Sequence, residues 1–428
     1  MKLAVFVEYL PPHMGSDYRI YQITKALAKD FDVFFAVFPP LRALGNIVDN
    51  SLKAYLANRE KTELPENFKA KYLKLPIFLY HLWAKLKILA YVLTLIVFFG
   101  KTIRLLKSIR PDVVVAAHPS YHCGLVGTLA AKILHIPVVL DYPDLWTPMT
   151  METLSWQKGN IKSVVLDVIE SIPVRLASHI VVVTNAIKDK VVRMGISNSK
   201  VTLVPNGVSP NELLLSSDAL IEINPLLNKN VILFSGRLER WSGLEYFLES
   251  IPYVLKTEPN NVFVIVGDGS HRKFLERKVF STNIKKHVIF TGFLNREKVW
   301  NLIRKANVCV SIFAEGATSN AAIPIKLLEY MALGKPIVTT ECKGLNDFLR
   351  DKENVFLTKL DAESIASAIT CILQDESLAR TIGLNAQRLV KEFFDWEILS
   401  LNFRKICYSV LALQNCINPE ECNLSHLS

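Results

Sequence analysis

The stretch AAIPIKLLEYMALGKPIV, residues 321–338, encodes a helix and the strand that follows it. Apolar residues recur in it at helical spacing, and Pro324 suits the first position of a helix. Gly334 is expected to end that helix, and residues 337–340 have the composition of a buried strand. A helix followed at once by a buried strand is the repeating unit of α/β folds. The stretch also places one acid, Glu329, in a helix that otherwise looks buried.

The same alternation of strand and helix recurs along the whole chain. Apolar, β-rich runs occupy residues 3–7, 33–37, 113–117, 138–140 and 180–184, and later residues 231–235, 263–266, 288–291, 308–312 and 337–340. Two successive β-α series predict two parallel-sheet domains. The boundary is expected at PNGVSP, residues 205–210, because proline, asparagine and glycine interrupt the pattern there. We therefore expect α/β domains at 1–204 and 205–394, followed at 395–428 by a helix that crosses back and a polar tail.

Length and composition narrow the class of protein. The 428 residues suffice for two domains of ordinary size, and half of them are apolar, which indicates a globular protein. The seven cysteines are scattered and contain no C-x-x-C pair, so neither a disulfide framework nor a zinc site is indicated. The apolar run in MKLAVFVEYLPP, residues 1–12, is too short for a signal peptide and predicts a first strand. We expect a cytoplasmic location in a reducing compartment.

Positive charge is concentrated in one segment. The net charge is +10, and residues 53–110 alone carry twelve basic and three acidic residues. From residue 67 to 110 there are nine lysines or arginines and no acid, interleaved with aromatic side chains. A basic, aromatic and apolar segment points to an anionic membrane surface. It is too apolar to be a reader of nucleic-acid grooves.

That segment is not expected to span the membrane. Its longest charge-free run, residues 88–100, has thirteen residues, short of the ~18 to 20 that a spanning helix needs. The alternative is that residues 88–99 form a helix packed beneath the next strand. We expect both: part of the segment packs on the domain and part lies in the membrane interface.

Ligands of open α/β sheets bind beyond the carboxyl ends of the strands, so chemistry is expected in the loops there. After the first strand, Gly15 in PPHMGSDYR would let the backbone approach a phosphate. The motif LDYPDLW places Asp141 and Asp144 just past a strand end. SGRL, residues 235–238, puts a lone arginine after a strand and a glycine, and GDG, residues 267–269, follows the strand FVIV.

Several motifs together resemble one enzyme family. PNGVSP, SGRLERWSG, VFVIVGDGS, VIFTGFL and PIKLLEYMALGKPIV occur in the order and spacing seen in retaining glycosyltransferases of family GT4. The terminal FFDWE, residues 393–397, resembles the closing motif of that family. In the first half the resemblance rests on PPHMG, RPDVVVAAH and DYPDLW. The last of these resembles the branch that adds N-acetylated sugars to lipid-linked precursors of surface polysaccharides. The resemblance implies the GT-B fold, with two Rossmann-like domains facing a central cleft.

The resemblance gives Glu329 a role. In this family the second glutamate of an E-x7-E motif accepts hydrogen bonds from the ribose hydroxyls of a nucleotide-sugar, and Glu329 matches it. The first turn of its helix, from Pro324 and Ile325, would direct backbone amides toward the donor. Without the resemblance, the alternative is a surface ion pair between Lys326 and Glu329.

A second charge is implied beside the donor diphosphate. Arg237 resembles the family arginine that contacts it, where negative charge grows as the sugar bond breaks. The alternative for Arg237 is a structural salt bridge with Glu239 or Glu245. The remaining donor-binding residues would be Gly15, Gly236, Gly267 and Asp268.

The chain also departs from the family pattern. The first glutamate of the E-x7-E motif is replaced by Ala321, and the lysine of G-R-L-x-x-x-K-G is replaced by Ser242. Lys326 could supply the missing positive charge, or it could be a solvated lysine. Many relatives carry a histidine where this chain has Pro143, and His118 could compensate or could be a packed loop residue.

The resemblance implies transfer of a hexosyl or N-acetylhexosaminyl group from a nucleotide-diphosphate sugar to a membrane-associated, lipid-linked acceptor. It implies retention of configuration, with the departing phosphate taking the acceptor proton and Asp144 positioning the acceptor or the sugar. Neither a metal nor another cofactor is expected, because Arg237, helix termini and Lys326 would neutralise the diphosphate. The protein would lie peripherally on the cytoplasmic face of the membrane, in polysaccharide or glycan biosynthesis, without a nucleic-acid partner.

Two alternatives come from other classes. One is a GT-B protein that has lost catalysis and serves as a subunit docked on a membrane glycan-synthesis complex, which Ala321 and Ser242 favour. Glu329, Arg237 and Asp144 argue against it. The other is a sugar-nucleotide epimerase of similar fold, which would not need the basic segment.

Overall fold

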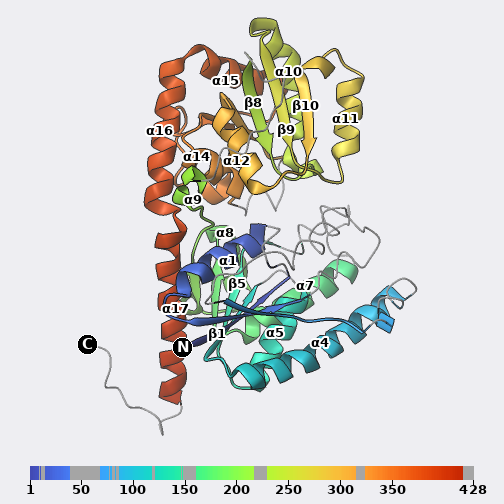
Figure 1. Cartoon of the computed structure of the whole chain (residues 1–428), viewed down its shortest axis with the longest axis vertical. Coiled ribbons are helices and arrows are strands. Elements are labelled where there is room, and N and C mark those ends of the chain that lie inside the picture. Colours follow the sequence, from blue (N-terminus) through green and yellow to red (C-terminus); the bar gives the residue numbers. More distant parts are fainter. Residues whose placement is uncertain are drawn as a thin grey trace. The chain divides into compact units, whose positions relative to one another are not determined.

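The structure is a computed structural model of the chain. It describes residues 1–8, 10, 15–38, 68–76, 78–79, 82, 86–117, 121–145, 147, 161–215, 229–314 and 323–417. The first of two compact units takes the described residues up to Pro205 and the chain from Trp396 onward, and the second unit takes Asn206–Asp395. Each unit is built on one parallel sheet (Figure 1), so the prediction of an α/β fold with two parallel-sheet domains is confirmed.

Seven described strands, all parallel, form the sheet of the first unit. They are β1 (Lys2–Val7), β2 (Asp32–Val37), β3 (Phe68–Tyr72), β4 (Val113–Ala117), β5 (Val138–Tyr142), β6 (His179–Val182) and β7 (Val201–Leu203). Their order across the sheet is β3-β2-β1-β4-β5-β6-β7. The sequence does not predict β3 or β7, because β3 is an edge strand with alternating lysines and β7 has only three residues.

Helices cover both faces of this sheet. They are α1 (Gly15–Leu27), α4 (Lys87–Ile109), α5 (Tyr121–Ile133), α7 (Ile161–Leu176), α8 (Asn185–Arg193) and α17 (Trp396–Ile417). Val5 of β1 faces the core that α1 and α17 close, while Phe6 points the other way and meets Gly127 of α5. α5 packs between α4 and α7 (Figure 1). The helix that begins at Trp396 thus completes the core of the first unit.

Helix α4 carries the basic, apolar segment and is longer than the predicted 88–99, because it continues through its basic residues to Ile109. Its buried stripe is Ala90, Thr94, Phe98 and Thr102. Its outward face is apolar in the first half and basic in the second, at Val92, Ile96, Arg104 and Lys107. Among the described helices, α4 alone is long and apolar enough to cross a membrane, and a third of that window is buried in the first unit.

Six described strands, also parallel, form the sheet of the second unit. They are β8 (Asn230–Ser235), β9 (Asn261–Val266), β10 (Val288–Gly292), β11 (Val308–Ser311), β12 (Ile337–Thr339) and β13 (Phe356–Leu357). Their order is β10-β9-β8-β11-β12-β13. The two-residue β13 is the one strand here that the sequence does not predict, because it is too short to show a pattern.

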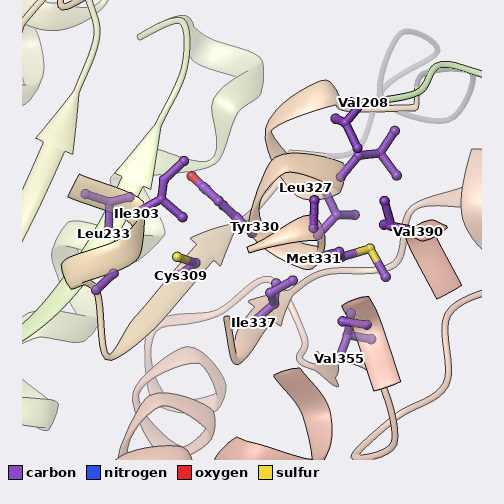
Figure 2. Close-up of a cluster of buried hydrophobic side chains, with 14 of the residues drawn as sticks. Val208, Leu233, Ile303, Cys309, Leu327, Tyr330, Met331, Ile337, Val355 and Val390 are labelled. Carbon is purple, nitrogen blue, oxygen red and sulfur yellow. The ribbon is translucent and has the colours of Figure 1, made fainter. Parts of the chain in front are cut away.

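The helices of the second unit form two layers. They are α9 (Pro210–Leu215), α10 (Leu244–Thr257), α11 (Arg272–Phe280), α12 (Arg296–Lys305), α14 (Ile325–Ala332), α15 (Ala362–Gln374) and α16 (Glu376–Phe393). Phe234 of β8 faces a core closed by α10, α11 and α15, whereas Leu233 faces a core closed by α12, α14 and α16. Figure 2 shows the second of these cores, in which Leu327 and Met331 of α14 are buried as predicted.

Candidate functional site

The carboxyl ends of β8, β9 and β10 meet at three glycines. The Gly236 amide donates to the Val266 carbonyl at 3.0 Å, and the Gly267 amide donates to the Gly292 carbonyl at 2.9 Å. These glycines have φ values of +142°, +129° and +71°, which side-chain-bearing residues rarely adopt. A Cβ on Gly267 would lie 1.9 Å from the Gly236 carbonyl oxygen. Glycine is therefore required for these strand ends to approach, and Gly236 and Gly267 remain partly accessible at the edge of the sheet.

The SGRL and GDG loops, far apart in the sequence, are bound to each other. The Leu238 amide donates to the Asp268 carbonyl at 3.1 Å, and the His271 amide donates to the Leu238 carbonyl at 2.9 Å. A Cβ on Gly269 would lie 2.3 Å from the Leu238 carbonyl oxygen. The Asp268 carboxylate accepts from Arg272 at 3.0 Å and from the Gly269 amide at 2.8 Å. Because both carboxylate oxygens of Asp268 already accept hydrogen bonds from neighbouring residues, Asp268 would contact a ligand mainly through its backbone.

Arg237 stands at the start of this loop pair with its side chain 57% exposed. Its Nη2 lies 3.0 Å from Oε1 of the buried Glu239, so the salt bridge considered from the sequence is present. Glu245 pairs with His271 instead, at 2.6 Å. Among the described residues no other group accepts from the guanidinium, and an exposed pair of this kind contributes only about 0 to 1 kcal/mol. Most of the guanidinium therefore remains available to an anion.

Lys326, on the first turn of α14, lies beside Gly236. Its Nζ would be 3.7 Å from a Cβ on that glycine. The ammonium lies over two aromatic rings, 3.9 Å from the Phe234 centroid and 4.8 Å from the Phe313 centroid. No described carboxylate lies within ion-pair distance of it, so the alternative of a surface pair with Glu329 is wrong. Burial lowers the pKa of Lys326 to about 7.

Glu329 is 8% exposed and sits one turn further along α14. Its Oε1 accepts hydrogen bonds from Arg296 Nη2 and from Trp300 Nε1, each at 3.2 Å. Both donors come from α12. Its second oxygen, Oε2, accepts no hydrogen bond from any described residue. Within the second unit, the described residues thus bond one of the two carboxylate oxygens of Glu329.

Tyr330 ties α14 to the end of β8. Its hydroxyl accepts from the Ser235 amide at 2.7 Å and lies 3.0 Å from the Ser235 hydroxyl. In Figure 2 the Tyr330 ring reaches from α14 toward the part of the core that holds Leu233 of β8. This bond fixes the helix that carries Lys326 and Glu329 against the end of β8, which directly precedes Gly236. Sequence reasoning missed it, because a tyrosine on a helix does not indicate its distant partner.

In the first unit, the loop that carries Asp144 is held by a buried acid. Glu170 of α7 accepts from the Tyr142 hydroxyl, from the Thr147 hydroxyl, from the Thr147 amide at 3.2 Å and from Lys190 Nζ at 3.0 Å. Tyr142 and Thr147 flank Asp144 in the chain. The network therefore anchors both ends of the loop, and it was not apparent from the sequence.

Asp141 does not lie past the strand end, as the sequence suggested. It belongs to β5, is fully buried and pairs with Arg19 of α1 through contacts of 3.0 and 3.1 Å. Arg19 also donates to the Pro205 carbonyl at 2.7 Å and lies over the Trp396 ring. Burial raises the pKa of Asp141, and Arg19 opposes that rise. This aspartate is accordingly structural.

The other predicted positions contribute less. Gly15 is the first residue of α1. His118 and Ala321 lie outside the described residues. Ser242 is buried and its hydroxyl donates to the Glu239 carbonyl at 2.6 Å, so it closes a turn and supplies no charge. Among the described residues no three His, Cys, Asp or Glu side chains gather as a metal site, and a metal-free reaction stays a prediction.

Two family models together span most of the chain. The one described as Glycosyltransferase Family 4 matches residues 15–212, and the one described as Glycosyl transferases group 1 matches residues 217–389. The chain is a GT4-type glycosyltransferase. The predicted family is thereby confirmed.

Individual relatives agree with this assignment. The uncharacterized glycosyltransferase MJ1607 of Methanocaldococcus jannaschii is 27% identical over 54% of this chain and 61% of its own length. The UDP-Gal:alpha-D-GlcNAc-diphosphoundecaprenol alpha-1,3-galactosyltransferase of Escherichia coli is 26% identical over 64% of this chain and 70% of that protein. HepE of Anabaena, solved in complex with UDP-glucose, has a TM-score of 0.71 at 18% identity and covers 95% of this chain and 99% of its own. This last likeness confirms the GT-B fold of the glycosyltransferase.

Proposed function

We propose that this glycosyltransferase binds a nucleotide-diphosphate sugar at the strand ends of its second unit and transfers the sugar, with retention, to a membrane-associated, lipid-linked acceptor. One observation carries the proposal. Arg237 and Lys326 lie at Gly236, Glu329 lies one turn after Lys326 on α14, and the described residues leave each of the three with unused bonding capacity. A donor with a diphosphate and a ribose would complete all three.

Each part of the donor has a matching group. Arg237 and the Lys326 ammonium flank Gly236, where a diphosphate would meet two cations and bare backbone. Oε2 of Glu329 would accept from a ribose hydroxyl. Pro324 caps α14 and has no N–H, so the first turn of the helix would add the backbone amides of Ile325 and Lys326, with the positive end of the helix dipole. The presence of UDP-glucose in HepE supports this class of donor.

Retention follows if the leaving group also serves as the base. As the bond from the anomeric carbon to the phosphate oxygen breaks, that oxygen gains negative charge and accepts the proton of the acceptor hydroxyl on the same face of the sugar. The acceptor oxygen forms its bond to the anomeric carbon from that face, and the nucleoside diphosphate leaves. Arg237 and Lys326 would stabilise that charge more strongly in the transition state than in the ground state. Asp144, which lies between the Tyr142 and Thr147 that Glu170 anchors, would orient the acceptor or the sugar. No separate base or metal is needed in this scheme.

The acceptor is proposed to be presented at an anionic lipid surface, with the enzyme on the cytoplasmic face. The outward face of α4 combines the apolar Val92 and Ile96 with the basic Arg104 and Lys107. Such a face suits the membrane interface. A surface position is favoured over a span because the opposite stripe of α4 is buried in the first unit. The lipid-linked substrate named for the Escherichia coli relative supports this acceptor class.

The test is a transfer assay with purified protein, a panel of nucleotide-sugars and lipid-linked acceptors extracted from membranes, followed by mass spectrometry. We expect one donor to be consumed and its sugar mass to appear on a lipid-linked product. Binding of a donor without any turnover would favour the catalytically inactive subunit, which the uncharged Ser242 supports. If no nucleotide-sugar binds, the donor site is misassigned.

A further inference from the structure

Glu329 is held from one side by a pair of donors on a neighbouring helix. Arg296 is the first residue of α12 and Trp300 lies one turn later, so both side chains leave the same face of that helix. Both donate to the same carboxylate oxygen, Oε1, at 3.2 Å. The other oxygen is left without a donor from the described residues.

The two donors differ in what they can do. Trp300 is 7% exposed and packs in the core that α14 also lines, so its indole has little freedom to move. The indole N–H can only donate, and it therefore fixes which oxygen of the carboxylate points at α12. Arg296 is half-exposed and adds a charge-assisted hydrogen bond to the same oxygen.

Helix α12 itself is fixed at its start. Asn295 caps it by accepting from the Lys298 amide at 3.1 Å, directly before Arg296. Trp300 and Ile303 of α12 are buried in the core with Leu327 of α14. The donors and the carboxylate are thus carried by two rigid elements of one unit, which suits a preorganised site.

We propose that Arg296 and Trp300 are positioning residues that hold Glu329 through Oε1 and so commit Oε2 to the ribose of the donor. This inference rests on the proposed function, because it assumes that Glu329 binds ribose. Without the pair, the carboxylate would rotate among several orientations and would meet the ribose hydroxyls in only a fraction of them. The pair would therefore act on donor affinity through Glu329, without contacting the reacting bond.

The experiment compares a ribonucleoside diphosphate with its 2′-deoxy counterpart. The probe is whichever of ADP, CDP, GDP and UDP binds the wild type most tightly, and dissociation constants are measured by titration calorimetry. The wild type should prefer the ribonucleotide by about tenfold or more, as expected for loss of a hydrogen bond to a charged group. In Trp300→Phe and Arg296→Met this preference should fall by at least about threefold, with the 2′-deoxy affinity nearly unchanged.

Two control variants and one kinetic readout make the result decisive. Lys298→Met removes an exposed charge from the same helix and should keep the wild-type preference. Arg296→Lys keeps a cationic donor and should recover part of what Arg296→Met loses. In transfer assays Arg296→Met should raise KM and leave kcat near that of the wild type. If the buried Trp300→Phe variant does not fold, Arg296→Met alone decides the outcome.

The possible outcomes separate this inference from the proposed function. A wild type that prefers the ribonucleotide, together with an unchanged preference in Arg296→Met, overturns the positioning role and leaves the donor site intact. A wild type that binds the nucleotide without any preference for ribose overturns the ribose role of Glu329 as well. A wild type that binds no nucleoside diphosphate overturns both.

Discussion

In the first unit the buried Arg19, Asp141 and Glu170 are paired within the unit, whereas two charged groups at the donor edge of the second unit keep unused bonding capacity. Arg19 and Asp141 satisfy each other, and Glu170 accepts from three residues around it. At the glycine edge of the second unit, Arg237 uses part of one guanidinium and Glu329 uses one oxygen. A buried charge that is fully paired maintains a fold, because removing either partner leaves the other uncompensated. A charge left partly unpaired at strand ends is better explained by a ligand.

The largest energetic effect is expected from a mutation in the fully paired Arg19–Asp141 ion pair of the first unit. Arg19→Met should leave Asp141 buried without a partner and lower the free energy of unfolding by about 3 to 5 kcal/mol. The double variant Arg19→Met with Asp141→Leu should regain most of this, since neither charge then remains. Urea denaturation measures both. If Arg19→Met is as stable as the wild type, the distinction between fully paired structural charges and partly unpaired ligand-binding charges fails.

Arg237→Ala tests the partly unpaired charges of the second unit through the rate of transfer. Because Arg237 is exposed, its loss should leave the free energy of unfolding nearly unchanged. Because it is proposed to face charge that develops as the sugar departs, kcat should fall by about a hundredfold. Arg240→Ala removes another exposed arginine of the same loop and should keep the wild-type rate. If the two variants are equally active, the guanidinium of Arg237 has no special role.

Glu329→Ala should affect binding more than rate. The ribose is remote from the reacting bond, so its contacts change little in the transition state. Loss of its hydrogen bonds should raise KM by roughly 10- to 150-fold with a much smaller change in kcat. Steady-state kinetics with Glu392→Ala as an exposed control checks this. A fall in kcat as large as that of Arg237→Ala would contradict the ribose assignment.

Lys326 should make donor binding depend on pH. Burial lowers the pKa of Lys326 to about 7. As pH rises above this value the ammonium is lost, and affinity for a nucleoside diphosphate should fall by at most about tenfold per pH unit. The free energy of unfolding should instead rise with pH above about 7. Over this window the lysine of the unfolded chain still binds its proton, whereas the lysine of the folded chain does not. Nucleotide titrations at several pH values give the slope of affinity against pH for the wild type and for Lys326→Met. If the slope persists in Lys326→Met, the assignment to Lys326 is contradicted.

The smallest effects are expected on α4. Neutralising Arg104 and Lys107 to glutamine should weaken binding to anionic vesicles by about fivefold per residue at low salt, and by less at high salt. Lys305→Gln, an exposed charge of the second unit, should have no effect. Vesicle flotation measures the bound fraction. If neither high salt nor carbonate releases the protein from membranes, a true span replaces the surface position.

The strands of both sheets were largely predictable because most are continuous apolar runs. The exceptions have physical reasons: β3 alternates lysine with apolar residues at a sheet edge, and β7 and β13 are too short to show a pattern. The end of the helix at Gly334 was also predictable, and that residue has a φ of +64°. The local sequence pattern was therefore enough to predict those strands and helix ends that local composition determines.

The pairing of charges was not predictable, since it depends on residues far apart in the chain. Asp141 and Asp144 look alike in LDYPDLW, yet Asp141 meets Arg19, which lies 122 positions away. Glu329 was singled out correctly as unusual, but its partners on α12 come from a different helix. The sequence indicated which loops hold candidates, and only the fold shows which charges are already satisfied.

The central claim is that the partly unpaired Arg237, Lys326 and Glu329 of the second unit bind a nucleoside diphosphate. Titration calorimetry of the wild type and of the triple variant Arg237→Ala, Lys326→Met and Glu329→Ala tests it, with ADP, CDP, GDP and UDP as probes and circular dichroism to confirm that both proteins are folded. We predict that the wild type binds at least one of the four and that the folded triple variant binds none measurably. Equal binding by the two proteins, or no binding by the wild type, would contradict the account.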